Sequence, residues 1–162
     1  MNQRNLDYLL WLLSNKEYPE KALRRKLKLR KVEDADADEL IDFLKEKDYL
    51  SDKRFKAARA SELVRRGEGP RSIQQKINRE AGSNINEDSF EDVYERLNTD
   101  SKEVLEKFLE KEYSKLLRGK FADDKYKIKQ KLIERAARRG HDLGEVFNVS
   151  ARIIEHHKEG IN

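Results

Sequence analysis

The chain has 162 residues, of which 42% are charged and only 36% hydrophobic, and it contains no cysteine. Lys and Arg number 36 against 32 Asp and Glu, which gives a formal net charge of +4. Such a composition cannot fill a thick globular core, and the lack of cysteine excludes disulfides, thiolate metal sites and cysteine nucleophiles. Because the apolar residues recur periodically and only two prolines interrupt them, we nevertheless expect a folded protein.

The sequence shows no sign of export or of membrane insertion. The N-terminal residues lack the long apolar stretch of a secretory signal, and no segment approaches the length of a membrane span. We therefore expect a cytoplasmic protein without membrane contact.

Apolar residues follow helical spacing along the whole chain, whereas no alternating run rich in Val, Ile and Thr predicts a strand. They form about nine stripes, and each stripe predicts one amphipathic helix. Most aromatic residues fall on these stripes, so we expect core packing for them, Tyr8 and Trp11 included. In chain order the stripes run Leu6 to Leu13, Leu23 to Leu27, Leu40 to Leu44, Phe55 to Ala58, Ile73 to Ile77, Phe90 to Leu97, Val104 to Leu116, Ile128 to Ala136 and Leu143 to Ile154.

Capping residues and helix breakers mark the ends of these helices. Pro19 and Pro70 suit first helical positions, where a missing N–H costs nothing. Gly67 suits a left-handed helix end before Pro70, and Gly119 is expected in an exposed loop. Further helix starts are predicted at the acidic capping boxes Asp36–Glu39, Asp100–Glu103 and Asp142–Glu145, and at the N-caps Ser51 or Asp52, Asn86 and Asp123.

A short signature with apolar residues four apart recurs at residues 23–27, 73–77 and 132–136. After each copy come a short gap and a second amphipathic stretch, which indicates helical modules packed in series. Three short amphipathic helices are about the least that can enclose a small core. The predicted modules are therefore residues 5–50, 51–98 and 99–157. Such modules usually form binding surfaces rather than catalytic clefts.

No set of residues supports catalysis or a metal site. The only histidines are His141, His156 and His157, and the last two point about 100° apart on a helix, which makes a poor chelate. Residues 67–70 lack the glycine spacing and the following Lys-Ser/Thr of a phosphate-binding loop. We therefore expect neither an enzyme nor a cofactor.

Basic residues cluster at 21–31, 65–71 and 125–139, whereas acidic residues dominate 87–112. A surface polarised in this way suits an anionic partner or a mixed-charge protein, although each cluster is also typical of a solvated helix face. Arginine pairs equally well with phosphates and carboxylates. The predicted face for binding DNA or a protein partner consists of Arg24, Arg25, Lys28, Arg65, Arg66, Arg71, Arg135, Arg138 and Arg139.

Four segments resemble motifs of the RecX family of recombination regulators, and they occur in family order over almost the whole chain. The segments are PEKALRRKL at 19–27, YLSDKRF at 49–55, GEGPRSI at 67–73 and RRGH at 138–141. The chain departs from the family pattern at Lys31 and Asp48, where glycines are expected. It departs again at His141, where an aromatic residue is expected, and at Gly82, which is displaced by one position.

The resemblance implies an all-helical protein of tandem three-helix repeats in an elongated, curved array. It implies a non-enzymatic regulator of the RecA recombinase, which binds the filament that RecA forms on single-stranded DNA. Filament growth, ATP hydrolysis and strand exchange would be modulated, chiefly by inhibition, in recombination, DNA repair and the SOS response. We expect a monomer, with weak direct DNA binding as an added property.

Two alternatives stay open. A stand-alone helical DNA-binding protein would lose affinity steeply with salt, but the net charge is small and no recognition helix shows a pattern for base readout. A general helical-repeat interaction scaffold explains the repeats equally well. It would leave the recombinase unaffected.

Overall fold

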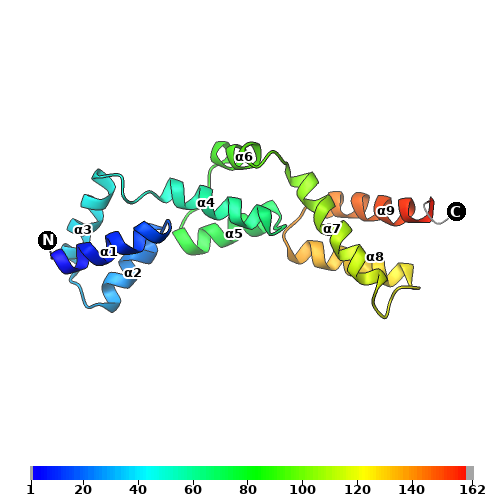
Figure 1. Cartoon of the computed structure of the whole chain (residues 1–162), viewed down its shortest axis with the longest axis horizontal. Helices are drawn as coiled ribbons and strands as arrows, with labels where there is room; N and C mark the ends of the chain where they lie inside the picture. The colour runs from blue at the N-terminus through cyan, green and yellow to red at the C-terminus, as the bar shows by residue number, and fades with distance from the viewer. Residues whose placement is uncertain (1, 160–162) are drawn as a thin grey trace. The chain divides into compact units, whose positions relative to one another are not determined.

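The structure, a computed structural model, describes residues 2–159. Within these residues it contains nine helices and no strand (Figure 1), which confirms the predicted all-α class. No helix in this part of the chain is long and apolar enough to cross a membrane. The helices are α1 (Gln3–Asn15), α2 (Glu20–Leu29), α3 (Asp34–Glu46), α4 (Asp52–Arg65), α5 (Pro70–Ala81), α6 (Glu87–Arg96), α7 (Ser101–Leu117), α8 (Lys125–Arg138) and α9 (Leu143–Glu159).

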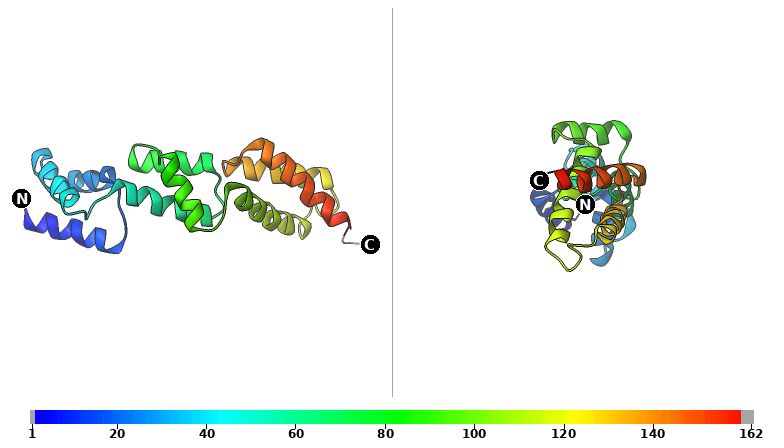
Figure 2. Two further views of the ribbon diagram at one scale, coloured as in Figure 1. Left: turned by 90° about the horizontal axis from the view of Figure 1, so that it is seen from above. Right: turned by 90° about the vertical axis from the view of Figure 1, so that its right-hand side faces the viewer.

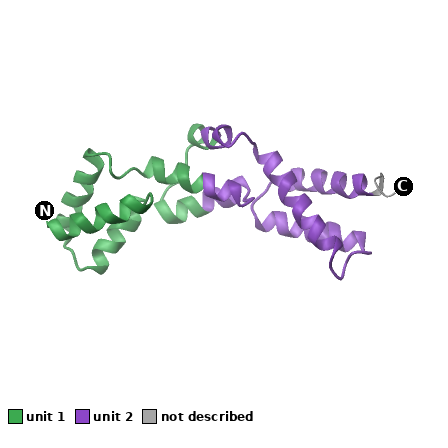
Figure 3. Cartoon of the chain, in the orientation of Figure 1, with its two compact units in different colours: residues 1–60, 76–90 green, residues 61–75, 91–162 purple. Residues whose placement is uncertain are grey.

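The chain divides into two compact units (Figure 3). Unit 1 comprises residues 1–60 and 76–90, and unit 2 comprises residues 61–75 and 91–162. The division falls inside α4, α5 and α6, because each of these helices has residues in both units. The three predicted modules stay a prediction.

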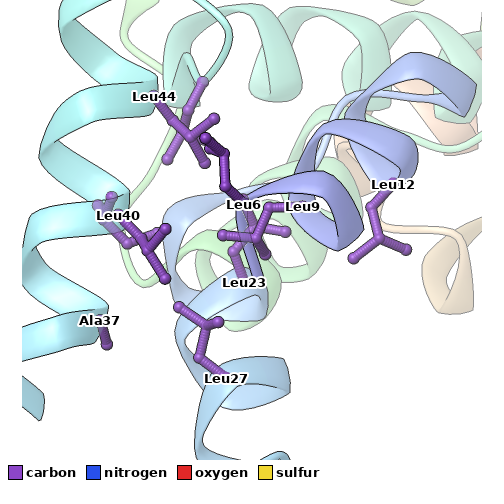
Figure 4. Close-up of a cluster of buried hydrophobic side chains, with 10 residues drawn as sticks. Leu6, Leu9, Leu12, Leu23, Leu27, Ala37, Leu40 and Leu44 are labelled. Atoms are coloured by element: carbon purple, nitrogen blue, oxygen red, sulfur yellow. The ribbon is translucent and has the colours of Figure 1, made fainter. Parts of the chain in front are cut away.

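Leucine side chains from α1, α2 and α3 form the core of unit 1 (Figure 4). Leu9, Leu23 and Leu40 come from three different helices, and all three are fully buried. In Figure 4, Leu6, Leu9 and Leu23 lie toward Leu40 and Leu44 of α3, whereas Leu12 lies on the far side of the group. Burying one such side chain contributes about 1.5–3 kcal/mol, so the leucine stripes hold these short helices together.

Trp11 lies outside this core, so the prediction of core packing was wrong for it. Its side chain is 62% exposed, whereas Tyr8 is half-buried against the core. The reason is helix geometry, because position 11 lies about 200° around the helix from the buried Leu9. The Trp11 ring stacks instead on Tyr8, with 6.5 Å between ring centroids.

Helices α7, α8 and α9 lie side by side and enclose the core of unit 2 (Figures 1 and 2). Each helix contributes an apolar stripe, as the sequence predicts. Leu143 and Phe147 of the α9 stripe are exceptions, because both are about half exposed, so the prediction of core packing was wrong for them. The buried residues of this core include Leu105, Leu109, Leu116, Ile128, Leu132, Ala136, Val146 and Val149.

Several predicted helix ends are confirmed. Asp100 caps α7 by accepting a hydrogen bond from the backbone N–H of Glu103 at 2.8 Å. Pro70 is the first residue of α5, and Gly67 before it has φ +79°. Further predicted caps that accept hydrogen bonds are Asn86 from Ser89, Asp142 from Glu145, and Ser51, rather than Asp52, from Arg54. Gly119 is exposed in the connection between α7 and α8, as predicted.

Three other predicted starts are shifted by one to three residues. Pro19 is the N-cap of α2 rather than its first helical residue. Asp36 lies in the first turn of α3, which begins at Asp34. Asp124, not Asp123, caps α8. Adjacent acidic residues compete for the N-cap position, so the sequence defines the first residue of such a helix only to within a turn.

The turns that lack the family's glycines keep a left-handed backbone. Lys31 follows α2 with φ 59°, and Asp48 follows α3 with φ 56°. The displaced glycine, Gly82, has φ +85°. The chain therefore retains this backbone geometry without glycine at Lys31 and Asp48, at a cost of about 1–2 kcal/mol for each residue.

Candidate anion-binding hollow

A hollow of about 500 Å³ opens on unit 2, and basic side chains outnumber acidic ones in its lining. Residues from the end of α4, the connection before α7, the exposed side of α7 and the end of α8 surround it. Only one acidic residue, Glu112, is among its 13 lining residues. The basic ones are Arg65, Arg66, Lys107, Lys111, Lys115 and Arg139, and we call this site the unit 2 hollow.

Helix α7 contributes three of these basic residues. Lys107, Lys111 and Lys115 are spaced four apart, so they share one face of the helix. Lys107 pairs with Glu103 at 2.6 Å, and Lys115 pairs with Glu112 at 2.6 Å. Lys111 forms no ion pair with any side chain of residues 2–157, so its charge is available to a ligand.

Arg139 is held in place by the segment that follows α4. Its guanidinium donates hydrogen bonds to the Glu68 carboxylate at 3.0 Å and to the Arg66 carbonyl at 3.2 Å. It also lies 5.5 Å from the centroid of the Phe108 ring, a cation–π contact. Glu68 is buried and accepts a further hydrogen bond from the Ser72 hydroxyl. Because these contacts fix its side chain, Arg139 is a preorganised part of the hollow.

Glu112 is charged but already satisfied. Burial favours its neutral form, but hydrogen bonds from Lys115 and Arg135, both 2.6 Å long, outweigh burial and hold the pKa of Glu112 below its usual value. The Glu112 side chain is 11% exposed. The hollow therefore stays net positive even though one carboxylate lies in its wall.

The structure brings together three of the residues that the sequence predicts in unit 2. Arg65, Arg66 and Arg139 line the unit 2 hollow. Arg135 does not line the hollow but pairs with Glu112, which does. Arg138 pairs with Glu134, one turn away on α8. Arg71 lies in the first turn of α5 and lines a separate hollow with Lys102, Asp142 and Glu145.

The three predicted residues in unit 1 have different surroundings. Arg24 pairs with Glu20 at 2.7 Å and with Asp38 at 2.6 Å, so it ties α2 to α3. Arg25 and Lys28 are exposed on α2. The single face that would join all nine predicted residues stays a prediction.

The three lysines of α7 are not among the residues predicted for the binding face. They fall within the segment 87–112 and just beyond it, where acidic residues dominate the composition. A spacing of four was the available signal, because it aligns Lys107, Lys111 and Lys115 on one helix face. Composition averaged over a segment concealed this local pattern.

The structure gives the histidines no metal-binding arrangement. Among the side chains that the structure describes, residues 2–157, no group of three or more His, Asp or Glu residues could hold a metal ion. His141 is buried, with Nε2 2.9 Å from the Gly67 carbonyl oxygen. Its ring stacks on Phe108 at 5.8 Å between centroids. His141 thus packs in the position where the family resemblance implies an aromatic residue.

The four motif segments contact one another in pairs. In unit 1, Asp52 accepts a hydrogen bond from the backbone N–H of Glu20 at 2.7 Å, and Arg54 pairs with Glu17 at 2.9 Å and Asp48 at 2.7 Å. In unit 2, the Gly69 N–H donates to the Arg139 carbonyl oxygen at 2.7 Å. The motifs therefore stabilise the fold, and in unit 2 they also place Arg139 in the hollow.

In the part of the chain that the structure describes, the fold is all-helical and carries a basic hollow. No family model matches the chain. The chain is 30% identical to the regulatory protein RecX of Acinetobacter baylyi over 145 residues, which cover 89% of this chain and 84% of that protein. It is 27% identical to RecX of Haemophilus influenzae over 113 residues, covering 70% and 73%.

Two solved structures share the fold. A crystal structure of a regulatory protein RecX aligns with a TM-score of 0.70 at 18% identity, covering 94% of this chain and 72% of that one. RecX from Lactobacillus salivarius aligns with a TM-score of 0.64 at 20% identity, covering 94% of each chain. The chain belongs to the RecX family of regulatory proteins. The predicted family, the fold of three-helix repeats and a regulatory rather than enzymatic role are confirmed.

Proposed function

We propose that this chain binds the filament of RecA on single-stranded DNA and restrains its growth, ATP hydrolysis and strand exchange. It would act in the cytoplasm, in recombination and DNA repair. The observation that carries the proposal is the unit 2 hollow, where six basic side chains surround one satisfied carboxylate in a member of the RecX family.

The mechanism is electrostatic and steric. Arg65 and Lys111 meet phosphates of the DNA strand or carboxylates of the recombinase, since both anions accept hydrogen bonds from basic side chains. The helical body then occupies space that filament growth needs. No cofactor takes part, because the effect depends on binding alone.

Direct binding to DNA is a second candidate function. It is favoured by one specific observation, namely that Arg65 and Lys111 form no ion pair with the side chains of residues 2–157. A stand-alone DNA-binding protein would bind bare strands with a steep salt dependence, because phosphate contacts release counterions. A general interaction scaffold, in contrast, would leave the recombinase unchanged.

The test is the ATP hydrolysis of RecA on single-stranded DNA, measured while the protein is titrated in at a fixed physiological salt concentration. We expect suppression, and a parallel titration with labelled DNA alone should show no binding at the same concentrations. Suppression well below one regulator per recombinase indicates capping of filament ends, and a near-equimolar requirement indicates coating of the groove. Unchanged hydrolysis contradicts the proposal.

A further inference from the structure

A second hollow, of about 410 Å³, lies in unit 1 and differs from the first in its lining. It is formed by the connection between α1 and α2, the first turns of α2 and α4, and the end of α5. Buried or half-buried residues, among them Tyr18, Ala22 and Phe55, form its apolar part. Exposed basic side chains surround them, namely Lys16, Lys21, Arg25 and Arg79, and we call this site the unit 1 hollow.

The two acidic residues of the unit 1 hollow are neutralised from outside it. Glu17 pairs with Arg54 at 2.9 Å, and Glu80 pairs with Arg59 at 2.8 Å. Neither arginine lines the hollow. The four basic residues of the rim are therefore not compensated by the carboxylates beside them, and the site attracts anions.

The basic rim is partly ordered. Lys21 Nζ donates a hydrogen bond to the Arg79 carbonyl oxygen at 3.1 Å, which joins α2 to the end of α5. Neither Arg25 nor Arg79 makes a side-chain ion pair in the part of the chain that the structure describes. Their guanidinium groups are free to bind carboxylates or phosphates.

The aromatic residues of the hollow do not offer an open face for a nucleic-acid base. Lys16 Nζ lies 4.8 Å and Lys26 Nζ 5.6 Å from the centroid of the Tyr18 ring. Phe55 is only 8% exposed. Proteins that bind single strands stack bases on aromatic side chains, and this hollow lacks that feature. An apolar side chain, which needs only a concave apolar surface, fits better.

We propose that the unit 1 hollow binds an acidic peptide segment of a partner protein. One apolar side chain of the peptide enters the space beside Tyr18, Ala22 and Phe55, and flanking carboxylates pair with Lys16, Lys21, Arg25 and Arg79. Charge complementarity supplies the specificity, and burial of the apolar side chain supplies affinity. This inference goes beyond the filament proposal, because it concerns another surface and another ligand.

The test uses the full chain and a fluorescein-labelled peptide of sequence EDLFDE, followed by fluorescence anisotropy at low salt. We expect saturable binding below about 1 mM, the range of weak peptide recognition. The peptide EDSSDE, which keeps the charges but lacks the apolar pair, and the basic peptide KKLFKK should both bind at least about tenfold more weakly. Because no recombinase is present, the result is independent of the filament proposal.

Two variants locate the site. The pair Arg25→Glu and Arg79→Glu should weaken EDLFDE binding by about tenfold or more, since both rim charges are reversed. Ala22→Phe should also weaken it, because the larger side chain fills the apolar space without changing charge. The control pair, Lys47→Glu and Lys53→Glu, changes the net charge equally at exposed positions outside the hollow and should bind like the wild type.

Circular dichroism of each variant verifies that it folds. The inference is overturned if EDLFDE does not saturate, or if the control pair weakens it as much as the rim pair does. It is equally overturned if a thymidine 12-mer displaces the peptide and if the Arg25→Glu and Arg79→Glu pair weakens binding of the 12-mer more than binding of the peptide. That result would assign the hollow to a nucleic-acid strand.

Discussion

Gly140 lies so close to Ser72 that a Cβ atom added to Gly140 would be 2.3 Å from the Ser72 backbone nitrogen. Gly140 also has φ +75°, a conformation that side chains disfavour. Next to it, the Arg71 N–H donates a hydrogen bond to the Gly140 carbonyl oxygen at 3.2 Å. Two motif segments far apart in the sequence therefore pack backbone against backbone, which explains why both contain glycine.

We expect Gly140→Ala to destabilise the protein by about 2 kcal/mol or more, because both the close contact and the positive φ oppose a side chain. Gly119→Ala is the matched control, since the nearest atoms to its added Cβ are 3.5 Å away. Its effect should stay within about 0.5 kcal/mol. Urea denaturation of both variants measures the difference, and equal midpoints would contradict the proposed packing.

Lys31→Gly should stabilise the protein. Relief of the left-handed backbone at φ 59° is worth about 1–2 kcal/mol, and the extra entropy of glycine in the unfolded chain offsets about 0.5–1 kcal/mol. The expected net gain is about 0.5 kcal/mol. Arg25→Gly, at an exposed position in the middle of α2, should instead cost about 1 kcal/mol. Thermal unfolding should therefore move the two melting temperatures in opposite directions, and a lower Tm for Lys31→Gly would refute the argument.

His141 should make stability depend on pH. Burial lowers the pKa of His141, and the Arg139 charge lowers it further, while the Gly67 carbonyl and Glu68 act in the opposite direction. With the folded pKa below the ordinary value of 6.5, the unfolded chain binds the proton more readily. The contribution of His141 to the free energy of unfolding is therefore fully present above pH 6.5. It is lost as the pH falls through the pKa that His141 has in the folded protein.

The measurement is urea denaturation at several pH values between about 7.5 and 5, with His141→Phe as the comparison. Phenylalanine keeps the stacking on Phe108 but does not titrate. The wild type should lose stability relative to His141→Phe as the medium becomes acidic. Parallel profiles for the two proteins would show that His141 does not titrate in this way.

Asp52→Ala should destabilise unit 1 by about 1 kcal/mol, because the Glu20 N–H at the start of α2 loses the acceptor that lies 2.7 Å away. Asp52→Asn retains an oxygen at the same position and should restore most of the stability. Lys53→Ala, an exposed neighbour, serves as the control. If Asp52→Asn were as unstable as Asp52→Ala, the hydrogen bond would not be the cause.

Local patterns in the sequence predict most of the fold but only part of the candidate site. The apolar stripes predict nine helices because each stripe needs only the spacing within one segment. Trp11 was assigned to the core because it neighbours leucines, although its angular position places it outside. The unit 2 hollow is lined by residues from the end of α4, from α7 and from the end of α8. Contacts between segments so far apart in the chain leave no pattern within any one segment of the sequence.

The charge pattern shows the same limit. Arg65, Arg66 and Arg139 belong to the predicted face and meet at the unit 2 hollow, and their convergence depends on the docking of residues 66–69 against the end of α8. Arg24, selected on the same grounds, pairs with Glu20 and Asp38. Whether a basic residue is available to a partner depends on carboxylates brought near it by folding.

The most direct test of the central claim is the affinity of the protein for preformed RecA filaments on single-stranded DNA. The variant Arg65→Glu with Lys111→Glu reverses two charges of the unit 2 hollow, and Lys125→Glu with Lys129→Glu makes the same net change on α8, outside it. We expect the first pair to weaken filament binding by about tenfold or more and the second pair to bind like the wild type. Equal binding by both pairs would contradict the assignment of the unit 2 hollow to the filament.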